Sequence, residues 1–262
     1  FVTEDLWFSG APTMISHDLD SSYYFACTYV DTTPTFPSIY ETTEIGTILI
    51  KINAQGDVVW NHRIFNVSTS QKHPRHDPLE FELKNDSVLQ LSVRKFEFRE
   101  HWFDIQSWGE LKFYEFTTDG VEIDNFTYED GEIIIGRSGT LWLDDSTVIQ
   151  SYSDSKLFNP EAAWPNYRYR AILARIDVNG QALWKDSLKI DYAENDYWST
   201  SSRLKWVTDS VFAGAYCWYF REDSLSLLTT VRVFNRHVDG TLLWQRDYSP
   251  IENTIAYRVR YE

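Results

Sequence analysis

The feature that most constrains the fold is a turn pattern that recurs at a long, nearly fixed period. Four segments read as a strand, a glycine turn and a second strand, with the glycines at Gly56, Gly120, Gly180 and Gly240. These glycines are 64, 60 and 60 residues apart. A fixed period of this kind indicates repeated supersecondary units, each of which buries its apolar face against its neighbours.

A tryptophan follows the turn glycine by four residues in three of the four units, as Trp60, Trp184 and Trp244. The second unit has Asp124 at this position. We expect the tryptophan to lie on the last strand of its unit and to fill the space between adjacent units. This predicts a packing role for the ring rather than a ligand-binding one.

A second landmark precedes each glycine turn, an Asp-Ser pair between two strand-like runs. The pairs are Asp20-Ser21, Asp86-Ser87, Asp145-Ser146 and Asp209-Ser210. An Asp carboxylate can accept hydrogen bonds from backbone N–H groups two residues further on. Asn-Gly and Asp-Gly provide the positive φ angles of a two-residue hairpin. Each unit therefore reads as strand, Asp-Ser turn, strand, long loop, strand, glycine turn and strand.

No segment shows a sustained period of 3.6 residues, so we expect an all-β chain without helix. Four antiparallel strands repeated every 60 or so residues predict a β-propeller of four-stranded blades. The expected blades span 11–66, 78–128, 139–190 and 202–248, with an extra strand over 254–262, as one domain or part of a larger propeller. A β-solenoid or a sandwich is the rival, but sandwich strands do not usually repeat their turn chemistry at a long period.

The segments ARIDVNGQALWKDS (174–187) and VFNRHVDGTLLWQRDY (233–248) resemble the repeats of quinoprotein-like and outer-membrane-assembly-type propellers. Together with DSSYYFACTY (20–29), they resemble still more the propeller repeats of secreted proteins from gliding and gut bacteria. The resemblance covers nearly the whole chain and implies a propeller in an extracytoplasmic location: secreted, periplasmic or at the cell surface. Because such repeats are scaffolds with many uses, it implies no activity.

Recurring Asp-Ser and Asp-Thr pairs followed by an aliphatic residue or Thr, such as Asp186-Ser187-Leu188, resemble the O-glycosylation motif of the same bacterial group. Several of these pairs are equally well explained as the blade turns. A net charge of −15 repels phosphate backbones and argues against nucleic acid as a partner. No apolar run reaches the roughly 18 residues of a transmembrane helix. Cys27 and Cys217 fall in corresponding strands of the first and fourth units and are expected as a disulfide or as two buried thiols.

The long connections between strands gather at the end of the blades opposite the turns, where binding groups usually reside on a rigid scaffold. Six aromatic residues mark these connections as a candidate ligand-binding surface: Trp102, Trp108, Trp164, Tyr167, Tyr197 and Trp198. Exposed rings there could stack on sugars or anchor a protein partner. The alternative is that they pack the connections onto the blades.

Metal and catalytic sites receive little support from the sequence. His73, His76 and His101 do not form a zinc-ligand pattern, because such sites need three or four convergent ligands. Paired carboxylates, such as Asp144-Asp145, Glu129-Asp130 and Glu222-Asp223, arise readily among 39 acidic residues. Since no nucleophile elbow, P-loop or HExxH motif is present, we predict no cofactor and no metal.

These observations predict a secreted or cell-surface β-propeller that acts as a binding or scaffolding module for a protein or a glycan. One alternative is a glycan hydrolase or lyase that uses carboxylates on the same scaffold, which a raised carboxyl pKa would favour. A second alternative is a structural subunit of a cell-envelope complex, which a large apolar surface would favour.

Overall fold

The chain forms strands and turns throughout the residues described by the computed structural model. These residues are 6–17, 20–32, 43–68, 74–97, 108–129, 133–144, 146–157, 167–188, 196–201, 204–221 and 227–248. No helix occurs within these ranges, so the all-β prediction is confirmed.

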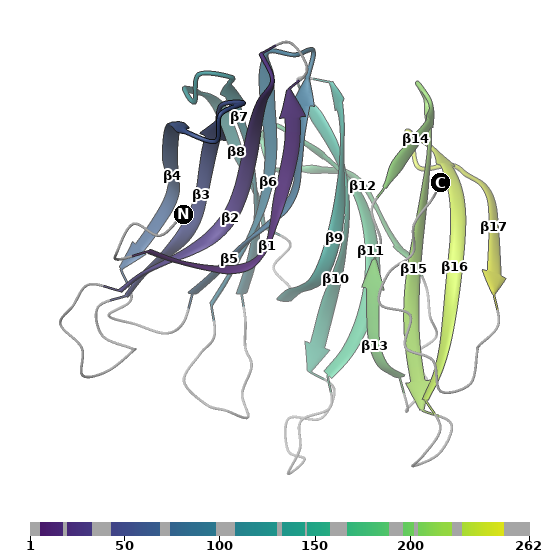
Figure 1. The fold of residues 1–262 in the computed structure, drawn as a ribbon. Helices are drawn as coiled ribbons and strands as arrows, with labels where there is room; N and C mark the ends of the chain where they lie inside the picture. The colour runs from purple at the N-terminus through teal and green to yellow at the C-terminus, as the bar shows by residue number, and fades with distance from the viewer. Residues whose placement is uncertain are drawn as a thin grey trace. The chain divides into compact units, whose positions relative to one another are not determined.

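The strands form four antiparallel sheets (Figure 1). The first sheet contains β1 (Leu6–His17), β2 (Ser22–Thr32), β3 (Thr43–Ile52) and β4 (Val58–Ser68). The second contains β5 (Pro74–Lys84), β6 (Val88–Glu97), β7 (Trp108–Thr117) and β8 (Glu122–Glu129). The third contains β9 (Ile133–Asp144), β10 (Thr147–Leu157), β11 (Tyr167–Asp177) and β12 (Ala182–Leu188). The fourth contains β13 (Asp196–Ser201), β14 (Lys205–Thr208), β15 (Val211–Arg221), β16 (Leu227–His237) and β17 (Leu242–Tyr248).

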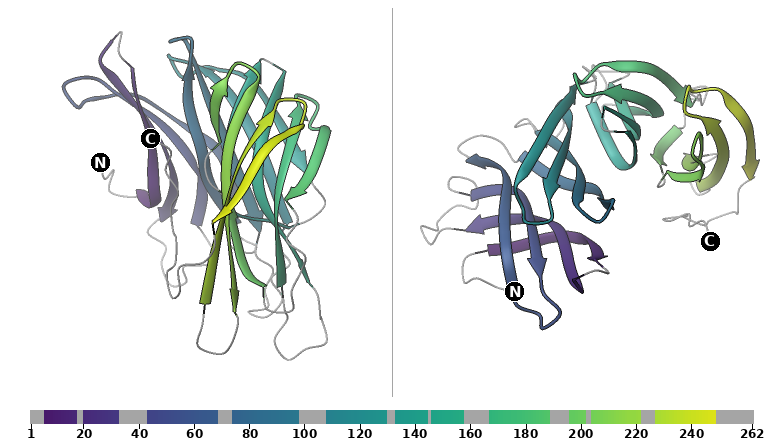
Figure 2. Two further views of the ribbon diagram at one scale, coloured as in Figure 1. Left: turned by 90° about the vertical axis from the view of Figure 1, so that its right-hand side faces the viewer. Right: turned by 90° about the horizontal axis from the view of Figure 1, so that it is seen from above.

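Strand order within each sheet follows the chain, as the continuous colour change across each sheet shows (Figure 2). The predicted series of four repeating units, each an antiparallel sheet, is therefore confirmed. The sheets belong to two compact units, Phe1–Glu129 and Asp130–Glu262, and each unit holds two of them. The predicted extra strand over 254–262 lies outside the described residues.

The first strand of each sheet begins upstream of the predicted blade, at Leu6, Pro74, Ile133 and Asp196. Each of these strands pairs irregularly with its neighbour at one or two points, as between Ser9 and Thr13 on β1. In the fourth sheet the first strand is divided into β13 and β14. A bulge interrupts the two-residue alternation of side chains, so the sequence pattern becomes readable only after it.

The glycine turns differ from the predicted two-residue hairpins. In the first sheet the N–H of Gly56 donates to the carbonyl of Asn53, and the N–H of Asn53 donates to the carbonyl of Asp57, both at 3.0 Å. The same pair of bonds recurs around Gly120, Gly180 and Gly240. Among these turn residues only the glycines have positive φ, between 72° and 94°. The connection is a three-residue loop that ends in a left-handed glycine.

The Asp-Ser turns also depart in detail from the prediction. Asp20 accepts the N–H of Ser22 at 2.9 Å, as expected. In the third sheet the accepting carboxylate is Asp144, which takes the N–H of Ser146 at 2.8 Å. In the second sheet no carboxylate is needed, because Asn85 and Asp86 both have positive φ (48° and 54°) and form a two-residue hairpin.

Each compact unit has a core made by both of its sheets. In the first unit Tyr24 and Leu49 of the first sheet join Leu89, Leu91 and Phe116 of the second. The second unit has the corresponding cluster: Leu141, Ile149, Ala171, Leu173, Leu204, Phe212, Tyr216 and Phe234. Complete burial of an aliphatic or aromatic side chain contributes roughly 1.5–3 kcal/mol, so these clusters fix the two sheets of each unit face to face.

Candidate interaction surfaces

Trp60 joins the first sheet to the second. Its indole Nε1–H, from β4, donates to the backbone carbonyl of Thr118 at 3.2 Å, in the glycine turn of the second sheet. The ring lies over Gly120, where an added Cβ would approach the ring atom Cδ2 to 3.0 Å. The Tyr24 hydroxyl donates to the same carbonyl at 3.4 Å. The predicted packing role between adjacent units is therefore confirmed for Trp60.

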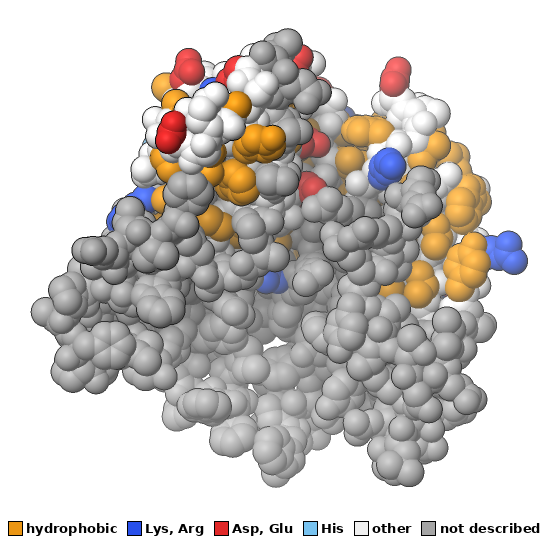
Figure 3. Space-filling model, viewed as in Figure 1, with side chains coloured by type: hydrophobic (Ala, Val, Ile, Leu, Met, Phe, Trp, Pro, Cys, Tyr) orange, Lys and Arg blue, Asp and Glu red, His pale blue; other side chains and the backbone are white. Residues whose placement is uncertain are grey.

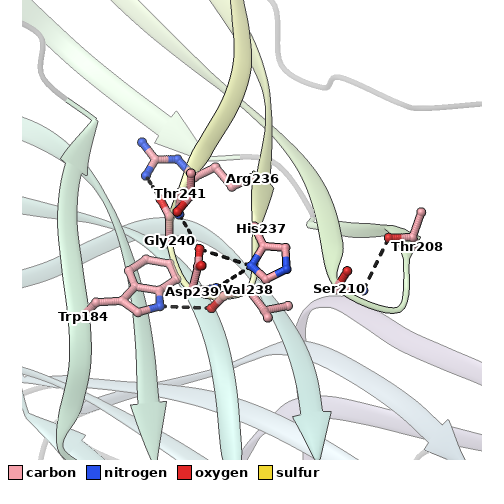
Figure 4. A network of polar contacts seen from close by, with 9 residues as sticks. All are labelled: Trp184, Thr208, Ser210, Arg236, His237, Val238, Asp239, Gly240 and Thr241. Atoms are coloured by element: carbon pink, nitrogen blue, oxygen red, sulfur yellow. Dashed lines mark hydrogen bonds and ion pairs between the residues drawn. The ribbon is translucent and has the colours of Figure 1, made fainter.

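Trp184 makes the equivalent contact in the second compact unit (Figure 4). Its Nε1–H, from β12, donates to the carbonyl of Val238 at 3.1 Å, and the ring lies over Gly240 with 3.1 Å from Cδ2 to an added Cβ. The Arg236 Nη2 also donates to the Asp186 carboxylate at 2.5 Å, across the same two sheets. The third and fourth sheets are thus joined by a ring, a hydrogen bond and an ion pair.

The acceptor in both contacts is the peptide two residues before the turn glycine. The N–H of Thr118 donates to the carbonyl of Ser87 at 3.2 Å, and that of Val238 donates to the carbonyl of Ser210 at 2.9 Å. The serine turn therefore holds the N–H end of this residue while its carbonyl receives the indole. Sequence reasoning found both motifs but missed their connection, because the groups that link them are backbone atoms without a sequence signal.

Trp244 has the same place in the fourth sheet but a different environment. It is 45% exposed on β17. When the Asn235 amide is oriented to satisfy both groups, its oxygen accepts the Trp244 Nε1–H at 2.9 Å within the same sheet. At the opposite margin of the repeat series, an added Cβ on Gly56 has no described atom within 4 Å. Gly56 thus has no described ring against it, and Trp244 has no described turn against it. The Gly180 turn follows the sheet that has Asp124 at the tryptophan position.

The last strand of every sheet carries an exposed aliphatic side chain three residues after the turn glycine. These side chains are between 52% and 55% exposed: Val59, Ile123, Leu183 and Leu243. In the fourth sheet Leu242, Trp244 and Tyr248 are also exposed on β17. Figure 3 shows orange, hydrophobic side chains over the part of the molecule where Figure 1 draws β16 and β17. Exposed hydrophobic residues at a strand edge are typical of surfaces that pair with other chains.

The described carboxyl groups with clear pKa shifts are all kept ionised. The hydrogen bonds from Arg232 lower the pKa of Asp247, and the Nη2 bond measures 2.6 Å. Backbone N–H groups do the same for Asp177 and Asp239. At Asp144, burial raises the pKa, but hydrogen bonds from Ser146 and Thr147 outweigh it. Each described carboxyl group with a clear shift is therefore more acidic than usual, the opposite of what a general acid requires.

Four of the six predicted ligand-binding aromatics lie on strands rather than in loops. Trp108 is the first residue of β7, Tyr167 is the first of β11, and Tyr197 and Trp198 lie on β13. All four are at the end of their sheet opposite the glycine turn. They lie on strands because the strands are longer than the sequence pattern indicated. Trp102 and Trp164 lie outside the described residues. The ligand role of all six stays a prediction.

The candidate metal and catalytic residues are only partly covered. His76 lies on β5 opposite Lys95, whereas His73 and His101 fall outside the described residues. Within the described ranges, no group of three or more His, Cys, Asp or Glu side chains is placed to hold a metal ion. Of the paired carboxylates, Asp144 and Glu129 are described and their partners Asp145 and Asp130 are not.

Cys27 and Cys217 are free, buried thiols. Burial raises the pKa of each to about 11, so both stay protonated at neutral pH. A protonated, buried thiol is a poor nucleophile and behaves as a small apolar side chain.

No family model matches this chain, and no curated protein is significantly similar to it. Within the described ranges, no helix has both the length and the apolar character needed to cross a membrane.

Proposed function

We propose that this chain is a secreted or cell-surface β-propeller that acts as a binding or scaffolding module for a protein or a glycan. The observation that carries this proposal is the repeated contact between consecutive sheets, Trp60 with Thr118 and Trp184 with Val238. A propeller is built by radial repetition of one blade-to-blade packing, and the same contact in both compact units supports that arrangement.

The two ends of the sheets support a binding role. At one end the strands are joined by short turns with fixed hydrogen bonds. At the other end the strands are joined by the longer segments 33–42, 98–107 and 158–166, and the last two contain Trp102 and Trp164. Variable connections on a rigid scaffold are where proteins usually carry their binding groups, and aromatic rings dominate such contacts.

The pKa shifts of the described carboxyl groups support binding over catalysis. A glycan hydrolase needs one carboxyl group with a raised pKa to protonate the leaving group. The described carboxyl groups with clear shifts, Asp144, Asp177, Asp239 and Asp247, all have lowered pKa values. The exposed aliphatic side chain on the last strand of each sheet favours a second candidate, a structural subunit of a cell-envelope complex.

A glycan array and a pull-down from the surface fraction of the source cells test this proposal. The wild-type chain is compared with Trp102→Ala, Trp164→Ala and Trp198→Ala, and with Leu183→Ala as a matched control on another surface. We expect a glycan or protein ligand whose binding is lost in at least one tryptophan variant and kept in the control. Binding that survives all three tryptophan substitutions would contradict the assignment of the ligand to this end of the sheets.

A further inference from the structure

We infer that the chain associates head to tail with a second copy of itself, with Trp244 of one copy docking on the Gly56 turn of the other. The inference rests on the blade arrangement of the proposed function, but it uses the turn end and the last strand rather than the long connections. The predicted contact, a tryptophan ring on a glycine turn, is the one that already joins the sheets within each compact unit.

The ring half of this contact is present on β17. Trp244 follows Gly240 by four residues, as Trp184 follows Gly180. Trp184 is half-buried because the Val238 peptide and Gly240 of the next sheet lie against it. Trp244, at 45% exposure, has its N–H directed to Asn235 of its own sheet. The Asn235 bond keeps the indole N–H satisfied while the ring is free, so the undocked surface is stable in water.

The turn half is present in the first sheet. Gly56 has φ +92°, close to the +94° of Gly240, and the same two backbone hydrogen bonds close its turn. An added Cβ would lie 3.0–3.1 Å from a tryptophan ring at Gly120 and Gly240, whereas at Gly56 it meets no described atom within 4 Å. The peptide two residues before Gly56 is Ala54, so its carbonyl is the equivalent of the two indole acceptors.

The neighbouring side chains are compatible with this docking. In the internal contacts the residue two after the tryptophan meets the residue four before the next glycine. Asp186 meets Arg236 in this way, and His62 meets Phe116 with ring centroids 5.6 Å apart. The corresponding pair between two copies is Arg246 and Ile52. This pair places no second charge against Arg246, and because Ile52 is only 7% exposed in the single chain it adds little new burial.

A second copy is the occupant because one chain carries both halves. The ring and the turn are different surfaces, so the association is heterologous and each copy contributes one of each. Because each copy carries one ring and one turn, the smallest species that brings a ring onto a turn is a pair of copies, and a dimer is the expected species.

Sedimentation velocity across a wide range of protein concentration tests the inference. The wild-type chain is expected to form a reversible dimer. Trp244→Ala removes the ring, and Gly56→Asn fills the space over the turn with a residue that tolerates the left-handed region. Each variant alone is expected to be monomeric. A mixture of the two is expected to associate one to one, because the first keeps an intact turn and the second an intact ring.

The control is Leu183→Ala, which removes an equally exposed apolar side chain from the third sheet and is expected to dimerise as the wild type does. Thermal unfolding checks that each variant folds, and Gly56→Ala replaces Gly56→Asn if the latter does not. A wild-type chain that stays monomeric at every concentration overturns the inference. So does a dimer that survives both substitutions, or a mixture that does not associate. Loss of self-association with ligand binding intact would leave the proposed function standing.

Discussion

Trp184 and Trp244 occupy the same position in two consecutive sheets and have different environments. The Trp184 ring lies over Gly240 and donates to Val238, whereas Trp244 is nearly half exposed and bonds to Asn235 beside it. The residues opposite them in the neighbouring strand differ accordingly. Arg175 cannot accept an indole N–H, and Asn235 can. A motif residue thus gains its structural role from the sheet that follows it.

The turn glycines show the same contrast. Gly240 and Gly56 have nearly equal φ angles, +94° and +92°, so the backbone alone requires glycine at both. Only Gly240 also has an indole ring against it. Gly56 has only the conformational role of the glycine, whereas Gly240 has that role and a close-packing role. Substitutions of Gly56 and Gly240 can therefore measure the two roles separately.

The largest effect is expected from Trp184→Ala. The substitution removes the ring between the third and fourth sheets and leaves the Val238 carbonyl without its donor. We expect a loss of about 3 kcal/mol in the free energy of unfolding, measured by urea denaturation. An unfolding midpoint equal to that of the wild type would show that the ring does not join the sheets.

Gly240→Ala and Gly56→Ala separate the two roles of the turn glycine. Both variants place a Cβ in the left-handed region, which costs about 1–2 kcal/mol. Gly240→Ala also forces the new Cβ against the Trp184 ring, so its loss of unfolding free energy should exceed that of Gly56→Ala. The comparison is made by urea denaturation of the dilute protein, and equal losses would contradict a packed ring at Gly240.

The fold was largely predictable from the sequence because the residues that form its turns are close together in the chain. A glycine that must have positive φ leaves the same signal at all four turns, and four of these signals predicted four sheets. Bulges in the first strands hid where β1, β5, β9 and β13 begin. In the third sheet the sequence predicted Asp145 as the accepting carboxylate of the Asp-Ser turn, whereas the acceptor is Asp144. The two acids are adjacent, so the sequence alone does not distinguish them.

The contact between sheets was only half predictable. The tryptophan position indicated a ring between units, but its acceptor is a main-chain carbonyl, which any residue provides. Thr118 and Val238 share no side-chain chemistry that could have identified them. The exposure of Trp244 was also hidden, because it depends on which sheet follows rather than on the residues around it.

Asp186→Asn is expected to have a smaller effect. The Arg236 side chain is almost fully buried and Asp186 is about half exposed, so the ion pair between the sheets is partly screened. We expect a coupling of about 1 kcal/mol from a double-mutant cycle with Arg236→Gln. Zero coupling would mean that only the ring joins these two sheets.

The acid stability of the fourth sheet depends on a carboxyl group within that sheet. Arg232 lowers the pKa of Asp247 below its unfolded value, so this pair stabilises the fold fully above the unfolded pKa of about 4. The contribution is lost as the pH falls through the lower, folded-state pKa. Asp247→Asn should therefore lose less stability than the wild type between pH 4 and strongly acidic conditions, measured by urea denaturation at each pH. If the unfolding free energies of the two proteins fall equally with pH, Asp247 does not contribute to the acid stability of the fourth sheet.

The smallest effect on monomer stability is expected from Trp244→Ala. No described turn lies against its ring, which is 45% exposed, so its removal should cost less than about 1 kcal/mol in dilute solution. Thermal unfolding of this variant beside Trp184→Ala gives the comparison directly. A loss as large as that of Trp184→Ala would mean that Trp244 is covered in the monomer.

The most direct test of the central claim is the hydrogen exchange of the indole N–H groups, followed by NMR on protein with labelled tryptophan and kept dilute. Single substitutions assign the resonances. If consecutive sheets are joined by tryptophan and turn, the N–H groups of Trp60 and Trp184 should exchange slowly and that of Trp244 rapidly. Equal rates at Trp184 and Trp244 would contradict the claim that the following sheet gives the motif its structural role.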